Sequence, residues 1–160
     1  MDIKKKTCFF TGHRILPMNN LLEIQKCLED RIISLINQGI IYFKSGGAIE
    51  FDTIASLTIL RLKENYPFIK LILVLPCKEQ DKYWTDYNKC LYKYILEKTD
   101  EIIYVSEKYY KGCMHKRNRY LAECSCYCIA YLNEQKSGTA YTVNYARKKN
   151  VNILNVAALV

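Results

Sequence analysis

Two hydrophobic patterns alternate along the chain. Short runs rich in β-branched and aromatic residues are separated by longer segments in which apolar residues recur every three or four positions. The short runs are typical of buried strands, and the longer segments are typical of helices that cover a sheet. The predicted strands are residues 6–11, 40–44, 71–75, 101–105, 127–132 and 152–155. The predicted helices are residues 20–37, 51–65, 87–98, 114–124 and 139–149.

The alternation of strands with helices predicts that neighbouring strands are parallel, because a helix is the usual crossover in a parallel sheet. We therefore predict an α/β, Rossmann-like three-layer domain with a mainly parallel sheet of about six strands flanked by helices. No linker, low-complexity tract or internal repeat interrupts this order, and Pro17, Pro67 and Pro76 all fall at predicted element ends. We expect residues 1–160 to form one domain, since this length is sufficient for a single buried core.

Hydropathy bears on where in the cell the protein is located, and charge bears on which classes of partner it binds. No run approaches the roughly 18 to 20 apolar residues that a membrane span needs, and no apolar signal stretch follows the charged residues 1–6. We expect a cytoplasmic protein with no membrane partner. The formal net charge of +8 attracts anions, which are either the phosphates of a small molecule or a nucleic-acid backbone. The basic runs 4–6 and 147–149 are more typical of solvated element ends than of binding sites.

Eight cysteines are scattered along the sequence. A chain of this length without a secretory signal does not need a disulfide framework, so we expect reduced thiols. Cys124, Cys126 and Cys128 form the one cluster, but they lack the paired spacing of structural zinc sites. We therefore expect no metal site.

Ligands of open parallel sheets bind at the carboxyl ends of the strands, where strand-to-helix loops meet. Three of the predicted loops at these ends contain glycine, at residues 11–14, 45–48 and 136–140. Glycine lets backbone amides approach an anion, and the following helix adds a favourable dipole, although a glycine turn can equally reflect tight geometry. The candidate ligand-binding residues in these loops are Gly12, His13, Arg14, Ser45, Gly46, Gly47, Ser137, Gly138 and Thr139.

Arginines and carboxylates near these loops are further candidates. On the predicted helix 114–124, Arg117 or Arg119 could hold a phosphate, although an exposed basic helix face is the alternative. Asp52 could cap a helix or accept a hydrogen bond from a ribose hydroxyl. Glu50 could also point into the pocket, so Glu50 and Asp52 are the candidate catalytic residues. No second carboxylate at recognisable spacing completes an acid–base pair.

The remaining residues leave open whether the chain is an enzyme. His13 and His115 are the only histidines, and no serine or cysteine lies in a recognisable nucleophile motif. Aromatic residues at 83–84 and 109–110 could form a wall for a base, or they could be ordinary half-buried side chains.

A series of motifs runs through the predicted carboxyl-end loops. They are Thr11-Gly12-His13-Arg14, Ser45-Gly46-Gly47-Ala48 with Asp52, Leu75-Pro76-Cys77, Gly112-Cys113-Met114 with Arg117-Asn118-Arg119, and Ser137-Gly138-Thr139-Ala140-Tyr141. This order resembles the SLOG superfamily over residues 6–155, and more narrowly its small bacterial and phage branch related to YpsA and YoqJ. The resemblance implies a Rossmann-like fold and a nucleotide or nucleotide-sugar ligand near the glycine loops and the arginines.

The superfamily that the chain resembles includes the LOG phosphoribohydrolases and the DprA proteins, which bind single-stranded DNA. The LOG motif P-G-G-x-G-T-x-x-E carries a glutamate that takes part in the reaction. Residues 137–142 have neither the doubled glycine nor this acid, so the resemblance does not carry the hydrolase activity over. Glu50 also stands where the resemblance leads us to expect glycine or another small residue.

Three functional hypotheses follow. The first is binding or sensing of a nucleotide-derived small molecule, such as a nucleotide, an ADP-ribose-like compound or a nucleotide sugar, with no required cofactor. The second is hydrolysis of an N-glycosidic or phosphate bond in a nucleotide. The third is binding of single-stranded nucleic acid, and in each case the domain could work as a homodimer.

Overall fold

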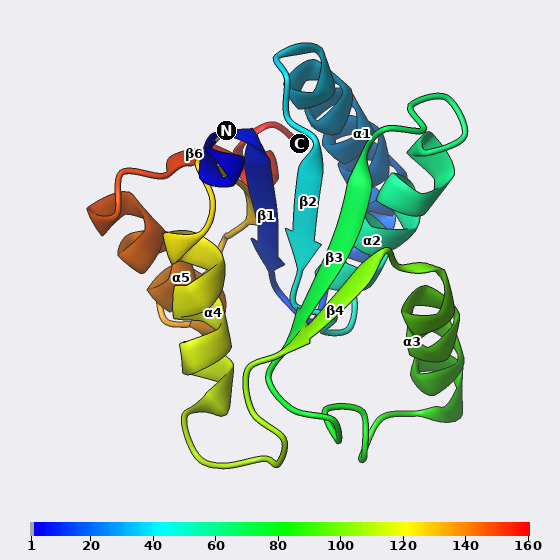
Figure 1. Ribbon diagram of the computed structural model, residues 1–160, viewed down its shortest axis with the longest axis vertical. Helices are drawn as coiled ribbons and strands as arrows, with labels where there is room; N and C mark the ends of the chain where they lie inside the picture. The colour runs from blue at the N-terminus through cyan, green and yellow to red at the C-terminus, as the bar shows by residue number, and fades with distance from the viewer. Residues whose placement is uncertain (1) are drawn as a thin grey trace.

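The computed structural model describes residues 2–160, which form one six-stranded sheet with helices on both faces (Figure 1). The strands are β1 (Thr7–Gly12), β2 (Tyr42–Ser45), β3 (Lys70–Leu75), β4 (Glu101–Tyr104), β5 (Tyr127–Tyr131) and β6 (Asn152–Asn155). Their order is β4-β3-β2-β1-β5-β6, and each neighbouring pair is parallel. The predicted α/β, Rossmann-like fold is confirmed.

Five α-helices connect the strands. They are α1 (Leu21–Asn37), α2 (Phe51–Leu62), α3 (Asp86–Lys98), α4 (Cys113–Glu123) and α5 (Gly138–Lys148). Figure 1 shows α1, α2 and α3 against one face of the sheet and α4 and α5 against the other. Short 3-10 turns are present at Ile3–Lys6, Met18–Asn20 and Val156–Ala158.

The two faces of the sheet have separate hydrophobic cores. In β3, Leu71 and Leu73 pack with residues of α1, α2 and α3, whereas Ile72 and Val74 pack with residues of α4 and α5. This alternation follows from the two-residue period of a strand, which sends successive side chains to opposite faces. Because both faces are covered, β3 and β5 are apolar over most of their length, whereas β2 carries Lys44 and Ser45 at its carboxyl end.

Local hydrogen bonds explain where the observed helix ends differ from the predicted ones. The helix predicted for 51–65 ends at Leu62, because the amides of Glu64 and Asn65 donate to carbonyl groups three residues earlier. The helix after β3 begins one residue earlier than predicted. There the hydroxyl oxygen of Thr85 accepts a hydrogen bond from the Asn88 amide at 3.2 Å and caps the helix.

The strand order places a crevice at the carboxyl ends of β1 and β5. From β1 the chain builds the sheet outwards through β2, β3 and β4, and then returns to add β5 on the other side of β1. The loops that follow β1 and β5 therefore lead to helices on opposite faces. This divergence is the topological switch point at which open α/β sheets bind ligands.

The cysteines lie within or beside these elements. Cys8 and Cys128 are fully buried in neighbouring strands, where they pack as small apolar side chains. No disulfide bond joins any of the eight cysteines in the described chain. Within residues 2–160, no helix combines the length and the apolar character needed to cross a bilayer.

We predict that Gly12→Ala destabilises the fold. A Cβ atom at this position would lie 2.4 Å from the ring of Phe51, at the point where β1 packs against the start of α2. Such overpacking costs about 1–3 kcal/mol, which lowers the melting temperature of a domain of this size by roughly 3–10 °C. Thermal unfolding followed by circular dichroism measures this change.

Gly138→Ala is the matched control for this experiment. A Cβ atom at Gly138 would meet no atom within 4 Å, and alanine favours the helix that begins there. The control variant should keep or slightly raise the melting temperature. Equal melting temperatures for the two variants would contradict the assignment of Gly12 to close packing.

Candidate functional site

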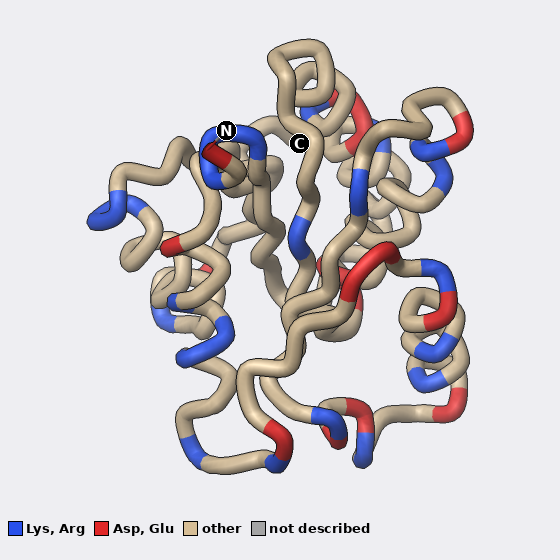
Figure 2. Tube along the Cα trace, in the orientation of Figure 1, with Lys and Arg blue, Asp and Glu red and all other residues tan. Residues whose placement is uncertain are grey.

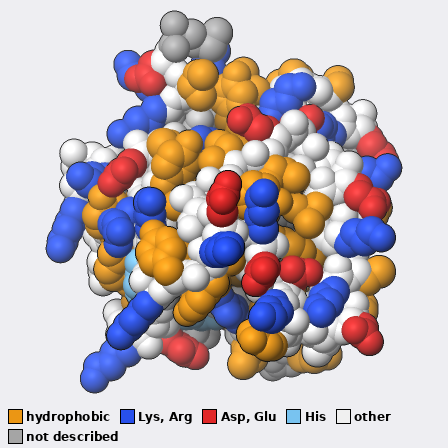
Figure 3. Space-filling view, turned by 60° about the horizontal axis from the view of Figure 1, so that its bottom comes forward, with side chains coloured by type: hydrophobic (Ala, Val, Ile, Leu, Met, Phe, Trp, Pro, Cys, Tyr) orange, Lys and Arg blue, Asp and Glu red, His pale blue; other side chains and the backbone are white. Residues whose placement is uncertain are grey.

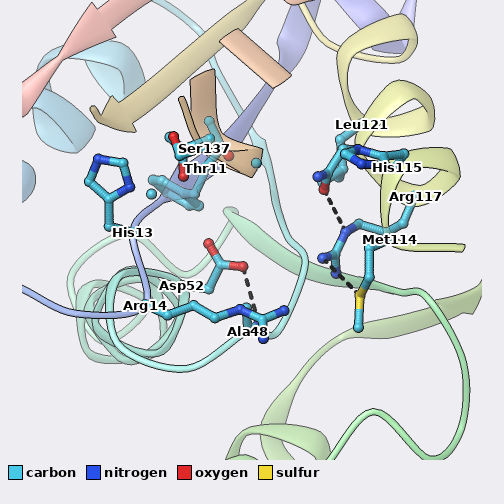
Figure 4. A pocket seen from close by; sticks show the side chains of 15 residues that line it. Thr11, His13, Arg14, Ala48, Asp52, Met114, His115, Arg117, Leu121 and Ser137 are labelled. Carbon is cyan, nitrogen blue, oxygen red and sulfur yellow. Dashed lines mark hydrogen bonds between the residues drawn. The ribbon is translucent and has the colours of Figure 1, made fainter. Parts of the chain in front are cut away.

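A cavity of about 270 Å³ lies at the switch point between β1 and β5 (Figure 4). Its walls come from the end of β1, the start of α2 and the first turns of α4 and α5. The sequence-predicted residues that line it are Gly12, His13, Arg14, Asp52, Arg117, Ser137, Gly138 and Thr139. The fold therefore gathers groups from four separate segments around one cavity.

Asp52 is a buried carboxylate at the start of α2. It is only 6% exposed, and its Oδ2 accepts a hydrogen bond from the Ala48 amide at 3.1 Å (Figure 4). Its Oδ1 is buried and has no hydrogen-bond partner within the described chain. Since Asp52 lines the cavity, this oxygen is an acceptor without a protein donor.

Burial raises the pKa of the Asp52 carboxyl to about 6, because the charged form loses its hydration. The positive charge of Arg117, the Ala48 amide and the positive charge of Arg14 act in the opposite direction but do not cancel this effect. Neither arginine makes a direct salt bridge with Asp52 in the part of the chain that the structure describes. At neutral pH Asp52 is therefore an ionised group held at a cost in stability.

Arg117 is buried at the other side of the cavity, with an exposed fraction of 4%. Its Nη1 donates to the carbonyl oxygens of Gly46 and Val74, and its Nε donates to Oδ1 of Asn118 at 2.7 Å. Burial lowers the pKa of its guanidinium, and the negative charge of Asp52 opposes this change. Arg117 thus joins α4 to the ends of β2 and β3, and most of its donors are already in use.

Of the second glycine loop, Ala48 lines the cavity, whereas Ser45, Gly46 and Gly47 do not, contrary to the expectation for these three residues. A Cβ atom on Gly46 would lie 2.5 Å from Nη1 of Arg117, and Gly47 has a φ of +68°. The Gly47 amide donates to the Ser45 hydroxyl oxygen at 3.2 Å, and the next amide in the loop serves Asp52. Packing at Gly46 and backbone conformation at Gly47 are therefore sufficient reasons for these glycines.

Arg14 is the exposed cation of the cavity. It follows β1 on the loop that opens the switch point, and its side chain makes no hydrogen bond to any residue in the range 2–160. Figure 4 shows its side chain extending beside Asp52 towards Ala48. With its donors unoccupied, Arg14 can form a bidentate contact with an anionic ligand.

The amino end of α5 provides a second set of hydrogen-bond donors at the cavity. The Ser137 hydroxyl oxygen caps the helix by accepting a hydrogen bond from the Ala140 amide at 3.1 Å. The amides of Gly138 and Thr139 have no acceptor among residues 2–160, and both residues line the cavity. Free amides and the helix dipole together favour a negative group at this position.

His13 fixes the geometry of the switch point. Its Nε2 accepts a hydrogen bond from the Asn133 amide at 3.0 Å, so it ties the loop after β5 to the end of β1. Its ring also meets the edge of Tyr131 at a centroid distance of 6.0 Å. Because Nε2 already has this partner, His13 positions the loop that leads to α5.

Arg119 and Glu50, two further candidates, lie away from the cavity. Arg119 donates to the hydroxyl of Tyr141 at 3.1 Å on the outer surface of α4 and α5. Glu50 is exposed, has a φ of +63° and lines a separate groove with Ile15 and Met18. Its positive φ explains why a glycine is the expected residue there. Glu50 and Asp52 do not share a cavity, so these two candidate carboxylates are not placed to act together in acid–base chemistry.

A signal in the sequence could have separated Arg117 from Arg119. Cys113, Arg117 and Leu121 recur at four-residue spacing, and all three are buried on one face of α4. Arg119 lies two positions from this series and therefore on another face. The apolar neighbours one turn away identify Arg117 as the arginine that points inward.

Gln80 was missed as part of this site. It is buried, and its Nε2 donates to the carbonyl oxygens of Gly46 and Gly47 at 3.3 and 3.4 Å. These hydrogen bonds hold the second glycine loop in place. No local sequence pattern marks Gln80, because its partners are more than thirty residues away.

Comparison with family models shows which protein family the chain belongs to. The family model YpsA, described as the YspA SLOG family, matches residues 9–157. The chain belongs to this SLOG family.

Relatives of this SLOG chain come from Bacillus and a related genus. YoqJ, an uncharacterised SPbeta prophage-derived protein of Bacillus subtilis, is 35% identical over 138 residues, which cover 76% of this chain and 81% of YoqJ. A UPF0398 protein of Halalkalibacterium halodurans is 29% identical over 129 residues, which cover 79% of this chain and 68% of that protein.

Two solved structures share the fold of this SLOG domain. The DNA processing protein DprA of Streptococcus pneumoniae superposes with a TM-score of 0.67 at 20% identity, over 94% of this chain and 50% of that protein. DprA of Helicobacter pylori, whose structure concerns single-stranded DNA binding, superposes with a TM-score of 0.67 at 22% identity. The match covers 94% of this chain and 65% of that protein, so the SLOG chain spans only part of either DprA.

We predict that Asp52→Asn stabilises the protein at neutral pH. Folded Asp52 keeps its proton up to about pH 6, whereas an unfolded aspartate loses it near pH 3.9. Raising the pH between these values therefore weakens the fold, by at most about 3 kcal/mol. Asparagine keeps an acceptor for the Ala48 amide without the charge. Thermal unfolding should show a higher melting temperature for the variant at pH 7.5, with the difference vanishing near pH 4.

Asp100→Asn serves as the control with the opposite sign. Burial acts to raise the pKa of Asp100, but hydrogen bonds from Lys63 and the Leu71 amide lower it overall. This variant should be less stable than the wild type at neutral pH, and the loss should shrink as the pH falls. A melting temperature for Asp52→Asn at or below the wild-type value at pH 7.5 would contradict the cost assigned to Asp52.

Proposed function

We propose that this SLOG domain binds a nucleotide-derived small molecule, with a phosphate at the amino end of α5 and a sugar hydroxyl at Asp52. The observation that carries the proposal is an unpartnered, buried carboxylate oxygen on Asp52, a residue that lines the same cavity as the free helix-end amides. A buried acceptor without a donor costs free energy, and a ligand can supply that donor. One ligand that carries both a hydroxyl and an anion satisfies both groups.

The phosphate is proposed to lie between α5 and Arg14. The amides of Gly138 and Thr139 and the dipole of an 11-residue helix favour an anion at this end of α5. Arg14 lines the same cavity and has its donors free to bind phosphate oxygens. Arg117 adds positive charge near Asp52 while its guanidinium stays hydrogen-bonded to the carbonyl oxygen of Gly46.

The sugar is proposed to lie beside Asp52. An ionised carboxylate only accepts hydrogen bonds, so its free Oδ1 selects a ligand group that donates one, such as a ribose hydroxyl. The cavity volume of about 270 Å³ is close to the lower end of the roughly 300–1,000 Å³ of sites that enclose a whole small molecule. This size suits the sugar and phosphate of a nucleotide better than the complete molecule.

Binding has more support than hydrolysis. Among the described residues that line the cavity, Asp52 is the single carboxylate. Hydrolysis by general acid–base chemistry ordinarily uses a second titrating group in reach of the scissile bond. Two histidines also line the cavity: His13 accepts a backbone hydrogen bond at Nε2 and holds a loop, and the ring of His115 packs against Tyr141 at a centroid distance of 4.3 Å.

Arg14→Ala should weaken the binding of ribose 5-phosphate and AMP. We expect a loss of about 10- to 100-fold, because a hydrogen bond to a charged group contributes roughly 1.5–3 kcal/mol. Arg119→Ala removes a cation outside the cavity and should leave both affinities within about twofold. Isothermal titration calorimetry at fixed ionic strength measures both variants against the wild type.

Asp52→Asn tests the sugar contact in the same assay. This variant retains the fold by the stability argument above, but it loses the ionised acceptor for the hydroxyl, so its affinity should fall by a similar factor. Unchanged binding by Arg14→Ala and Asp52→Asn would show that these ligands bind elsewhere. Absence of detectable binding by the wild-type protein at about 1 mM ligand would overturn the proposal. A dissociation constant of about 1 mM corresponds to a binding free energy of about −4.1 kcal/mol.

Single-stranded nucleic acid is the second candidate ligand. The fold resembles that of DprA, and the structure of the Helicobacter pylori protein is described as showing single-stranded DNA binding. The net charge of +8 suits a polyanion. However, Figure 2 shows Lys and Arg together with Asp and Glu along the loops at the carboxyl end of the sheet, so positive charge does not form a continuous stripe there.

Salt dependence separates the two ligands. A strand that displaces counterions from several phosphates should lose about two or more orders of magnitude in affinity between roughly 50 and 200 mM salt. A mononucleotide with one phosphate in the cavity should lose much less. Fluorescence anisotropy of a labelled oligonucleotide, with AMP as competitor, gives both salt slopes. A steep slope for the strand without competition by AMP would favour the nucleic-acid alternative.

A further inference from the structure

A second groove, with a volume of about 510 Å³, adjoins the cavity. Its aromatic residues are Tyr83 and Trp84 from the loop after β3 and Tyr109 from the loop after β4. Arg14 and Met114 line both the groove and the cavity, so the two spaces share a wall. The groove therefore lies next to the cavity, on the other side of Arg14 and Met114.

We propose that this groove binds the nucleobase of the ligand whose sugar and phosphate occupy the cavity. The inference rests on the proposed function, and it names the part of the ligand that the smaller cavity leaves outside. An aromatic base is flat and has two apolar faces, so it is recognised by stacking on aromatic side chains. Three aromatic residues from two loops line this groove beside the cavity.

The exposure of these aromatic side chains supports a binding role. Tyr83 is 89% exposed and Tyr109 is 64% exposed, so neither stabilises the fold by burial. Trp84 is half-buried and meets the edge of Tyr92 at a ring distance of 5.0 Å, which fixes its position in the groove that the two exposed tyrosines also line. Figure 3, with the carboxyl end of the sheet turned forward, shows hydrophobic side chains interspersed with basic and acidic ones on this surface.

The charged groups of the groove agree with a nucleotide and not with an apolar ligand. Lys82 lies over the ring of Tyr83 at 5.4 Å from its centroid, and Arg14 stands at the boundary with the cavity. Glu79 offers an acceptor at the rim of the groove, where a base presents amino groups at its edge. The groove thus combines faces for stacking with polar groups for the edges of a base.

The test compares a ligand with a base and one without it. AMP should bind about 10- to 100-fold more tightly than ribose 5-phosphate, given the stacking contribution of one base. The double variant Tyr83→Ala with Tyr109→Ala should reduce AMP affinity to near that of ribose 5-phosphate and leave ribose 5-phosphate unchanged. The phenylalanine double variant, which keeps both rings, should retain AMP affinity.

Tyr94→Ala is the matched control, because Tyr94 is an exposed tyrosine on α3 that lines neither space. It should not change either affinity. Trp84 gives an independent signal, since it is the single tryptophan of the chain. AMP should change its fluorescence at the concentrations at which it binds, and ribose 5-phosphate should not.

The outcomes separate the two proposals. Equal affinities for AMP and ribose 5-phosphate, with no effect of the tyrosine variants and no change in Trp84 fluorescence, would overturn the base groove and leave the sugar-phosphate site intact. Failure of both ligands to bind would overturn the proposed function and this inference together. A short single strand that alone changes Trp84 fluorescence, and loses affinity in the alanine double variant, would support the groove as a base site supplied by a strand.

Discussion

In this SLOG domain the guanidinium of Arg117 occupies the space that a side chain would fill at position 46. From α4 it donates to the carbonyl oxygens of Gly46 and Val74, and so it connects a helix on one face of the sheet to the ends of β2 and β3. This contact requires glycine at position 46 and ties down the loop after β2, whose Ala48 amide in turn holds the carboxylate of Asp52. Arg117 is therefore part of the frame that shapes the cavity.

The buried carboxylate of Asp52 lowers the stability of the folded protein. A pKa near 6 in place of 3.8 corresponds to about 3 kcal/mol at neutral pH, which is a large fraction of the roughly 5–15 kcal/mol that stabilises a typical domain. The hydrophobic cores on both faces of the sheet offset this cost. Groups whose burial destabilises the free protein are characteristic of functional sites, because the ligand can supply the missing partner.

The fold could be predicted because the sequence patterns that mark strands and helices are local. The role of each residue in the site depends instead on contacts between residues that are far apart in the sequence. Two-residue and 3.6-residue periods marked the strands and helices, and a cap such as Thr85 moved an end by a single residue. A glycine motif, by contrast, does not show what fills the space beside it. At Gly46 that space holds Arg117, 71 residues later, and at Gly12 it holds Phe51. Only the third glycine loop leaves its space open to a ligand, at Gly138.

The likeness to the two DprA structures, at 20% and 22% identity, concerns the fold alone. The ligand depends on features that a shared fold does not determine, namely how many anion-binding groups are present and what lies between them. A strand needs repeated phosphate contacts along an open surface. Here the free amides of one helix end and one exposed arginine, Arg14, meet in a single cavity, and the carboxylate of Asp52 lies beside them. Because a carboxylate repels a second phosphate and accepts from a hydroxyl, this arrangement agrees better with the proposed sugar and phosphate than with a strand.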